Sequence, residues 1–401
     1  MPYYGATGQV GWIDDYLFDE ELVLLGEDGA PFLEAGKPKA YLISGRSWVN
    51  NHAHVLRARD GVLDRFVLHQ LNSIDYHKFV SGTTRLKLPQ APMRSIPLRI
   101  APLAEQRRIV AAIEEHLSRL DAAVAGLKRV QAQLPRYRAA VLKAAVEGRL
   151  LQTEAGRCDG DALPTGWRSE PVADLAERVD YGTSAKTAEA GDIPVLRMGN
   201  IRDGTLVFDS LKYLPACHPE FPDLLLRAGD VLFNRTNSAE LVGKSAAYSG
   251  HPSPCSFASY LIRVRFRAGC LPVYFVAVLN SLYGRRWIAD VVSQQVGQAN
   301  VSGGKLKGFK IPLPPEEVQE RIVAEIDRCL SVAAAVEQEV ASGLAHAERL
   351  RQSILNHAFE GKLVPQDPND EPASVLLERI RAARATGAAP KRKPRPSTAR
   401  R

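Results

Sequence analysis

Cysteine is scarce in this sequence and is nowhere spaced to bind a metal. The 401 residues contain five cysteines, and no two of them form a C-x-x-C pair. Single, scattered cysteines are typical of proteins that keep free thiols in a reducing compartment. His52 and His54 lie two residues apart, on one face of an expected strand, but no third ligand accompanies them. We therefore predict no metal site, and a polar surface or core role for both histidines.

Long apolar runs are also missing. No run approaches the roughly 18 residues that a membrane-spanning helix needs. The first residues lack the pattern of a secretory signal peptide. Together with the unpaired cysteines, these absences predict a soluble, cytoplasmic protein. Hydrophobic residues still make up 45% of the chain, and 401 residues are enough for two or more domains with real cores.

Sequence motifs for catalysis are absent as well. An adenine methyltransferase needs D/N-P-P-Y/F and a glycine-rich cofactor loop, but the one Pro-Pro pair lies in L-P-P-E and no G-x-G-x-x-G occurs. A phosphate-binding loop needs G-x-x-x-x-G-K-S/T, and residues 238–245 read S-A-E-L-V-G-K-S, with Ser238 in place of the first glycine. A nuclease is disfavoured because Asp223, after Pro222, has no acid-x-Lys partner nearby. These absences disfavour a methyltransferase, a nucleotide-driven motor and a standalone nuclease, and they leave no candidate catalytic residues.

Basic charge is present, but it is concentrated at one end. The formal net charge is +7, and residues 390–401 hold six basic residues and no acid. A charge of this kind is weak evidence for a specific nucleic-acid site. We expect a disordered basic tail there. A short helix should precede the tail, with one apolar face formed by Val375, Leu376, Ile380 and Ala383.

The most informative feature of the sequence is a long internal repeat. Residues 102–113 read P-L-A-E-Q-R-R-I-V-A-A-I, and residues 315–326 read P-E-E-V-Q-E-R-I-V-A-E-I. Both copies run on to E-G-R/K-L, and they align without a gap at an offset of 213 residues. An ungapped repeat of this length indicates two copies of one structural unit.

Each copy is predicted to be a long amphipathic helix. Its apolar residues recur mostly in steps of three and four, which is typical of a helix packing along another helix. Pro102 and Pro315 precede or open the helices, and Gly148 and Gly361 lie where C-terminal caps are expected. Pro135 predicts a kink or a restart in the first copy. We expect antiparallel pairing of the copies through Ile109, Ile113, Leu117, Leu120, Val124 and Leu127 of the first and Ile322, Ile326, Leu330, Val340, Leu344 and Ile354 of the second.

Residues 1–100 and 164–312 are predicted to be two β-rich globular blocks with glycine turns. Helices are expected over 63–80 and 272–289, and a polar glycine loop over 297–307. The blocks align loosely, with Asn72 opposite Asn280 and Pro2 opposite Pro194. The first block then has no counterpart for about thirty residues, 164–193. We therefore expect either an incomplete first block or a true start upstream of Met1.

The order of block, helix, block and helix resembles the specificity subunit of type I restriction–modification systems. The resemblance is carried by the paired Q-x-R-I-V-A-x-I and E-G-R/K-L elements, the P-T-G-W opening of the second block and the I-P-L-P-P junction after it, and it extends to about residue 386. It implies an α+β fold in which two β-rich target-recognition domains are joined by two long helices that pair as an antiparallel coiled coil. The implied segments are a first, N-terminally incomplete recognition domain (1–100), a first spacer helix (101–150), a linker (151–163), a second recognition domain (164–312), a second spacer helix (313–363) and a short helix with a basic tail (364–401).

The same resemblance implies the function. In that family each block reads half of a bipartite DNA sequence, and the subunit itself catalyses nothing. The implied partners are double-stranded DNA, two methyltransferase subunits and restriction or translocase subunits. S-adenosylmethionine, ATP and Mg²⁺ would belong to those subunits, so this chain has no cofactor of its own. The thirty-residue gap motivates the alternative of a truncated or decayed subunit, a protein-assembly scaffold with one working half-site reader.

The candidate DNA-binding residues are donors and acceptors in expected loops and strand ends, because Arg, Lys, Asn and Gln usually read base edges. In the second block they are Arg197, Asn200 and Arg202, then Asn234, Arg235, Asn237 and Lys244, then Gln298, Asn300, Lys305 and Lys307. In the first block they are Tyr4, Asn50, Asn51, Arg85 and Lys87. Arg263, Arg265 and Arg267 share one strand face and either bind phosphates or simply solvate that face. For every candidate, plain solvation is the alternative.

Overall fold

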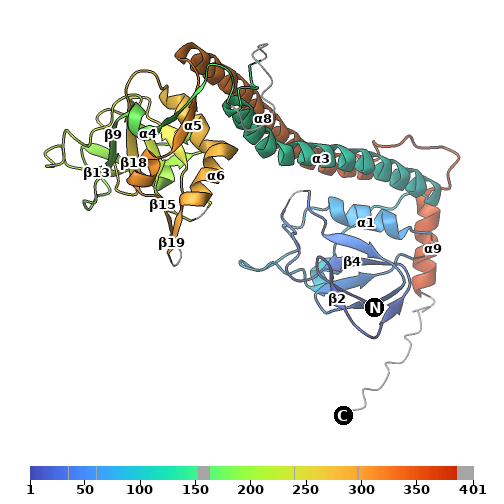
Figure 1. Cartoon of the computed structure of the whole chain (residues 1–401). Helices are drawn as coiled ribbons and strands as arrows, with labels where there is room; N and C mark the ends of the chain where they lie inside the picture. Colours follow the sequence, from blue (N-terminus) through green and yellow to red (C-terminus); the bar gives the residue numbers. More distant parts are fainter. Residues whose placement is uncertain (35, 60, 152–162, 239, 296–297, 386–401) are drawn as a thin grey trace. The chain divides into compact units, whose positions relative to one another are not determined.

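The computed structural model describes residues 1–34, 36–59, 61–151, 163–238, 240–295 and 298–385. The chain forms two compact units, Met1–Arg129 with Glu339–Arg401, and Val130–Gln338. Each unit holds one β-rich block and part of both long helices (Figure 1). The predicted linker lies almost wholly outside the described residues, and the basic tail from residue 386 lies wholly outside them. Within the described ranges, no helix combines the length and the apolar character needed to cross a membrane.

The two repeats form helices α3 (Leu103–Val146) and α8 (Glu316–Phe359), each of 44 residues. In the first unit, the beginning of α3 packs on the end of α8, where Ile113 shares a core with Leu355. In the second unit, the end of α3 packs on the beginning of α8, where Val141 shares a core with Ile322. The helices are therefore antiparallel in both units, which confirms the predicted fold.

The predicted seam residues are withdrawn from solvent to two degrees. Six of them are buried, namely Ile109, Ile113, Leu120, Ile322, Ile326 and Val340. The other six are half-buried, namely Leu117, Val124, Leu127, Leu330, Leu344 and Ile354. Ion pairs flank the seam, between Arg351 and Asp121 in the first unit and between Arg138 and Glu337 at 2.6 Å in the second.

Of the kink or restart predicted at Pro135, the restart is wrong, because α3 continues through this residue to Val146. A proline inside a helix removes one backbone hydrogen bond and crowds the preceding turn. Leu134 and Val141, on either side of Pro135, are buried. Tertiary packing thus offsets the local cost, as it usually does in long amphipathic helices.

The first block is built around strand β4, whose five residues are all buried. Val23 and Leu25 face one core, and Leu22 and Leu24 face another, so both faces of the strand are covered. The sheet orders are β2-β1-β6-β3 and β5-β4-β7. The predicted helix over 63–80 ends at residue 73. The elements are β1 (Pro2–Gly5), β2 (Gly8–Trp12), β3 (Phe18–Asp19), β4 (Leu22–Gly26), β5 (Ala40–Ile43), β6 (Arg46–Val49), β7 (Ala53–Leu56), α1 (Asp64–Ser73) and α2 (Gln90–Arg94), and α9 (Ala373–Ala385) belongs to the same unit.

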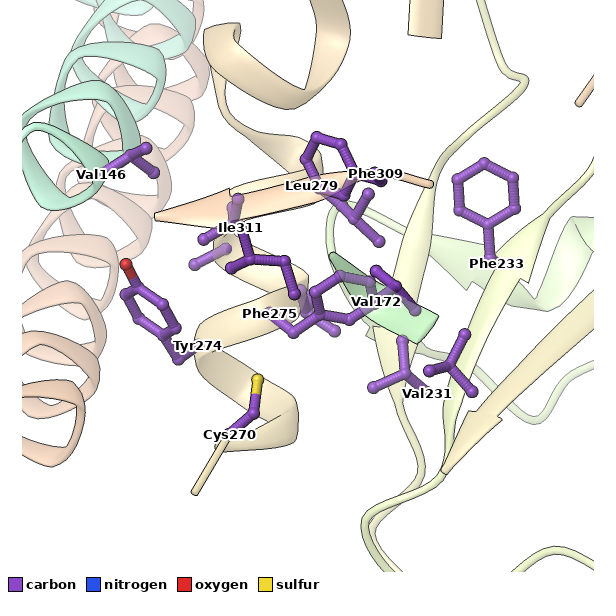
Figure 2. Close-up of a cluster of buried hydrophobic side chains, with 14 of the residues drawn as sticks. Val146, Val172, Val231, Phe233, Cys270, Tyr274, Phe275, Leu279, Phe309 and Ile311 are labelled. Atoms are coloured by element: carbon purple, nitrogen blue, oxygen red, sulfur yellow. The ribbon is translucent and has the colours of Figure 1, made fainter. Parts of the chain in front are cut away.

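The second block has a central sheet of order β16-β14-β18-β9. Its main core packs Val172 of α4 against Phe275 of α5 and Ile311 of β21 (Figure 2). The elements are β8 (Arg168–Pro171), α4 (Val172–Leu175), β9 (Ala176–Tyr181), β10 (Ile193–Leu196), η1 (Met198–Asn200), β11 (Ile201–Arg202), β12 (Thr205–Leu206), β13 (Lys212–Leu214), β14 (Val231–Asn234), β15 (Thr236–Asn237), β16 (Ser245–Ala247), β17 (Ser256–Phe257), β18 (Leu261–Phe266), α5 (Pro272–Asn280), α6 (Leu282–Val291), β19 (Ser293–Gln295), β20 (Gln298–Asn300), α7 (Gly303–Lys307) and β21 (Lys310–Leu313).

Two local predictions in the second block are wrong, and serine caps account for the unpredicted helix starts. The helix expected over 272–289 breaks at Ser281, whose hydroxyl accepts a hydrogen bond from Gly284 N and caps α6. The loop expected over 297–307 contains strand β20 and helix α7, and Ser302 caps α7 through Lys305 N. Serine competes for backbone N–H groups and so favours helix starts over helix interiors.

The two blocks share one topology, which confirms their predicted alignment. β4 pairs with β5 and β7, and β14 pairs with β16 and β18, all antiparallel. β1 runs parallel to β6 and antiparallel to β2, and β10 has the same relation to β17 and β13. Pro2 and Pro194 occupy matching positions. In the part of the first block that the structure describes, β8, α4 and β9 have no equivalent.

Matching side chains fasten each block in the same way. Asn72 bonds the backbone N–H and C=O of Ala40, and Asn280 bonds those of Ser245. The buried Gln106 of α3 accepts from Leu63 N and donates to the carbonyls of Gly61 and Ala101. Gln319, its equivalent on α8, accepts from Leu271 N and donates to Gly269 O and Pro314 O. Each long helix is therefore tied at its start to one block.

Candidate nucleic-acid interface

Three strand ends of the second block bring an arginine and two tyrosines together. β9 ends at Tyr181, β14 leads into Arg235, and Tyr260 precedes β18. The Arg235 guanidinium carbon lies 4.6 Å from the centre of the Tyr181 ring, and Arg235 N donates to Tyr260 O at 3.0 Å. A cation over an aromatic face is held there by electrostatic attraction. The two tyrosines are 44% and 48% exposed, so this strand-end cluster faces solvent.

The small sheet β15-β20-β19 adds two amides to the cluster. Arg235 donates to Asn300 Oδ1 at 3.4 Å. Asn237 donates to the Met198 sulfur at 3.3 Å, which brings the turn after β10 to the same place. Arg235 and Asn300, which come from two stretches predicted separately from the sequence, therefore meet in space. Amide and guanidinium groups of this kind bond base edges in the major groove.

Two predicted asparagines lie beneath the surface instead. Asn200 is 3% exposed, accepts from Arg197 N and donates to Val207 O and Asp209 O. Asn234 is 1% exposed and donates to Leu241 O. Direct base contact needs an accessible amide, so in this conformation both side chains shape the loops that carry the exposed residues.

The remaining candidates of the second block lie on the surface or close to it. Arg202 is exposed and pairs with Asp209 at 2.9 Å, and Lys305 donates to Ser293 Oγ at 2.8 Å. Arg197 and Lys244 are half-buried, and Lys307 is exposed. The Gln298 side chain lies outside the part of the chain that the structure describes, as do those of Gln294 and Gln295.

The expectation for Arg263, Arg265 and Arg267 is wrong for the first two. Arg263 is fully buried and donates to Asp180 at 2.7 Å. Arg265 forms two bonds of 2.7 Å with Asp230, which raise the pKa of this guanidinium. Buried charges persist when they are paired and hydrogen-bonded in this way. The pairs hold β9, and the residue before β14, to β18. Of the three arginines, Arg267, which follows the strand, is the exposed one.

The first block repeats the backbone of the strand-end cluster with other side chains. In the first block, Glu27 N donates to His52 O, and Leu88 N donates to Glu27 O. In the second block, Arg235 N donates to Tyr260 O, and Val301 N donates to Arg235 O. Lys87 pairs with Asp28, the residue after Glu27, and Asn300 pairs with Thr236, the residue after Arg235. Lys87 and Asn300 are therefore equivalent. Two candidates predicted independently thus occupy equivalent positions.

Charge distinguishes the two clusters. In the first block, Asp28 lies 2.7 Å from Arg85 and 3.6 Å from Lys87, so the acid offsets part of the basic charge. Asn50 accepts from His52 N, and its own N–H donates to Tyr4 O. Tyr4 and Asn50 are half-buried, and Asn51 is exposed.

Sequence reasoning missed the aromatic residues of this interface. Tyr181 and Tyr260 lie in or beside strands, where tyrosine usually indicates a half-buried core position. Their exposure depends on which strand ends meet, and that is a tertiary property. His54 of β7 is buried and bonds Leu88 O at 2.8 Å, in keeping with a core role. Among the described residues, no group of three or more His, Cys, Asp or Glu is arranged to hold a metal ion.

Comparisons with known proteins agree with this architecture. Residues 1–134 and 164–341 match the family described as type I restriction modification DNA specificity domain. The type I restriction enzyme EcoKI specificity subunit of Escherichia coli (strain K12) is 29% identical over 356 residues, which cover 82% of this chain and 74% of that protein. The StySPI specificity subunit of Salmonella potsdam is 28% identical, with coverage of 82% and 74%.

Two solved structures share the fold. A chain from a type I R-M system has a TM-score of 0.63 at 23% identity, and the alignment covers 85% of this chain and 82% of that one. The HsdS subunit of Thermoanaerobacter tengcongensis has a TM-score of 0.55 at 20% identity, with coverage of 88% and 84%.

Proposed function

The chain belongs to the type I restriction modification DNA specificity family, and from this premise we propose that it is the DNA sequence-recognition subunit of a type I restriction–modification enzyme. It reads a bipartite target in double-stranded DNA, one half-site through each block. It acts in the cytoplasm as a non-catalytic subunit on which two methyltransferase subunits and the restriction subunits dock. S-adenosylmethionine, ATP and Mg²⁺ are bound by those partners.

The observation that supports this proposal most directly is the repeated strand-end cluster. Each block places a polar side chain at one equivalent backbone position, which Asn300 occupies in the second block and Lys87 in the first. Equivalent positions with different side chains are what two readers of two different half-sites require. Because each block is fastened to its own helix through Gln106 or Gln319, the helices fix where each reader is held.

The non-catalytic role is tested by reconstitution. The purified chain, incubated with DNA and labelled S-adenosylmethionine, should transfer no methyl group. Addition of its methyltransferase subunits should produce adenine methylation at one bipartite sequence. Methyl transfer by the purified chain alone would refute the scaffold role.

Half-site recognition is tested by paired substitutions. Arg235→Ala and Asn300→Ala should lower discrimination by about 1–3 kcal/mol for the base pair that each side chain reads, in one half-site only. Lys87→Ala should affect the other half-site. Arg267→Ala is the matched control, because this arginine is exposed in the same block but follows the opposite end of β18. Binding is measured against a set of singly mutated targets at fixed salt, and a uniform loss over all targets would contradict base reading by Arg235.

A further inference from the structure

The charge of Arg235 is not neutralised by an acid in the described part of the chain. Arg202 and Arg265 of the same block each bond an aspartate, at 2.9 and 2.7 Å. The Arg235 guanidinium lies instead 4.6 Å from the centre of the Tyr181 ring, and its Nη2 donates to Asn300 Oδ1 at 3.4 Å. Its Nη1 bonds no described residue. The positive charge and most of the terminal N–H groups therefore stay available to a ligand.

Burial decides which nitrogens of this guanidinium a ligand can reach. Nε of Arg235 is buried, and no described residue accepts a hydrogen bond from it. Nη1 is not among the buried atoms, and Nη2 has a second hydrogen beside the one that bonds Asn300. The reachable part of the group is therefore the fork formed by Nη1 and Nη2. Such a fork matches two acceptors on one base edge, and guanine presents O6 and N7 together in the major groove.

The Tyr181 ring that carries this guanidinium is held at both ends. Its backbone lies in β9 opposite Ile262 of β18. Its hydroxyl accepts a hydrogen bond at 2.7 Å from the backbone N–H of Gly303, the first residue of α7. A Cβ atom at residue 303 would lie only 3.1 Å from the hydroxyl oxygen, so glycine permits this close approach. Tyr181 is thus a fixed aromatic surface that is nevertheless 44% exposed.

The backbone of Arg235 is fixed as well. Arg235 N donates to Tyr260 O at 3.0 Å, and Arg235 O accepts from Val301 N at 2.9 Å. Asn300, which holds Nη2, pairs with Thr236 in the small sheet. Backbone, ring and amide therefore order the arginine before it meets DNA. Ordering a long side chain during binding weakens binding by roughly two- to tenfold, and an arginine that is already ordered avoids this loss.

Building on the proposed function, we propose that Tyr181 is a positioning residue, which holds Arg235 so that Nη1 and Nη2 bond O6 and N7 of a guanine. This guanine belongs to the half-site that the second block reads. Attraction between the ring face and the cation keeps the fork in one direction and away from neighbouring phosphates. Tyr181 acts through Arg235, so its contribution to specificity is confined to one G·C pair.

The first experiment identifies the base. The full-length chain, in complex with its methyltransferase subunits, selects from a pool of DNA duplexes randomised in sequence, and the bound duplexes are sequenced. Arg235→Ala should lose the preference at one position, and the parent complex should select G·C there. Replacement of this guanine by 7-deazaguanine, which lacks the N7 acceptor, should weaken binding of the parent complex by roughly threefold or more. The same replacement should leave binding of the Arg235→Ala complex unchanged.

The second experiment tests positioning. Tyr181→Leu should lower the preference for that G·C pair by roughly two- to tenfold and leave the preferences at other positions unchanged. Tyr181→Phe keeps the ring and should retain most of the preference. In a chain that already carries Arg235→Ala, Tyr181→Leu should change no preference further. Tyr283→Leu is the matched control, because this tyrosine is 43% exposed in the same block and its hydroxyl donates to Lys310 O at 2.9 Å.

Other results would overturn the proposal. A lost preference for A·T would assign Arg235 another base, and a uniform loss with a weaker salt dependence would assign it to a phosphate. Equal losses from Tyr181→Leu with and without Arg235, or from Tyr181→Phe and Tyr181→Leu, would remove the role of the ring. In all these cases the parent complex still selects a sequence, so the proposed function stands. A parent complex that selects no sequence would refute both.

Discussion

At the residue scale, the side chains that join helix and block are fully buried amides. Gln106 and Gln319 are each 0% exposed, and each bonds three backbone groups that have no other place in a helix or sheet ladder. A buried backbone group without a hydrogen-bond partner destabilises the fold by its full desolvation free energy. The two glutamines therefore stabilise the junctions by satisfying backbone groups, and a residue of similar size without the amide cannot replace them.

Substitution of these glutamines tests that role. Gln106→Ala should lower the free energy of unfolding by about 1–3 kcal/mol, and Gln319→Ala by a similar amount, because each leaves buried donors and acceptors unpaired. Urea unfolding measures both changes. The matched control is Gln133→Ala, at an exposed position of α3, which should stay within about 0.5 kcal/mol of the parent chain. Equal stability of all three variants would mean that water satisfies the junction groups.

The same scale shows what the sequence could not predict about the site. Residue types and loop positions drew attention to Arg235 and Asn300, whose side chains are hydrogen-bonded in the structure. Burial was not predictable, because the partners come from distant segments. Arg263 pairs with Asp180, which lies 83 residues away in the sequence. The strand's own sequence shows only that arginines alternate with apolar residues. Sequence periodicity tells which face a side chain shares and leaves open what covers that face.

At the element scale, the long helices were the most predictable part of the fold. Their seam repeats in sequence, and a repeated period needs no knowledge of distant partners. Short elements were less predictable, because a single serine cap at Ser281 or Ser302 decides where a helix begins. Within the seam, burial is uneven. Ile113 is 0% exposed, while Leu117, one turn later, borders a cavity of about 510 Å³ in the first unit.

This difference predicts the outcome of two substitutions in one helix. Ile113→Asp should unfold the first unit or cost well over the roughly 1.5–3 kcal/mol that burial of such a side chain contributes, because a charge is also placed in the core. Leu117→Asp should cost less, since water in the cavity can hydrate the carboxylate. Ser118→Asp, at the exposed neighbouring position, is the control. Thermal and urea unfolding rank the variants by their loss of stability. If Leu117→Asp lost more stability than Ile113→Asp, the assignment of these residues to the seam would be wrong.

At the scale of the whole molecule, the order of block, helix, block and helix was predictable because it is written twice. The alignment of the blocks was predictable for the same reason, and the structure confirms it strand by strand. The consequence of the unmatched segment was not predictable from residue types. Three-dimensional equivalence was needed to show that Leu98 and Ile311, each three residues before the carbonyl that a junction glutamine bonds, occupy one position with 41% and 0% exposure.

That comparison leads to a prediction about the stability of the two blocks. Every residue of β18 except the last is buried, and the strand lies between β14 and β9, whereas two of the four residues of β7 are half-buried and β4 is its one described strand partner. Alternate N–H groups of an edge strand point away from its neighbour and open without disrupting a second ladder. Amide exchange in β7 should therefore be faster than in β18, on the order of tenfold or more, because its local opening needs less free energy.

Exchange in the central strands provides the internal control for this comparison. β4 and β14 are buried along their whole length, and each has a neighbour on both sides. Their amides should exchange slowly and at similar rates, so that a difference confined to β7 and β18 reports the open edge and not a general loosening of the first block. Mass spectrometry of exchange in peptides covering residues 22–26, 53–56, 231–234 and 261–266 separates these cases. Slower exchange in β7 than in β18 would mean that other contacts protect this edge as well as β9 protects β18.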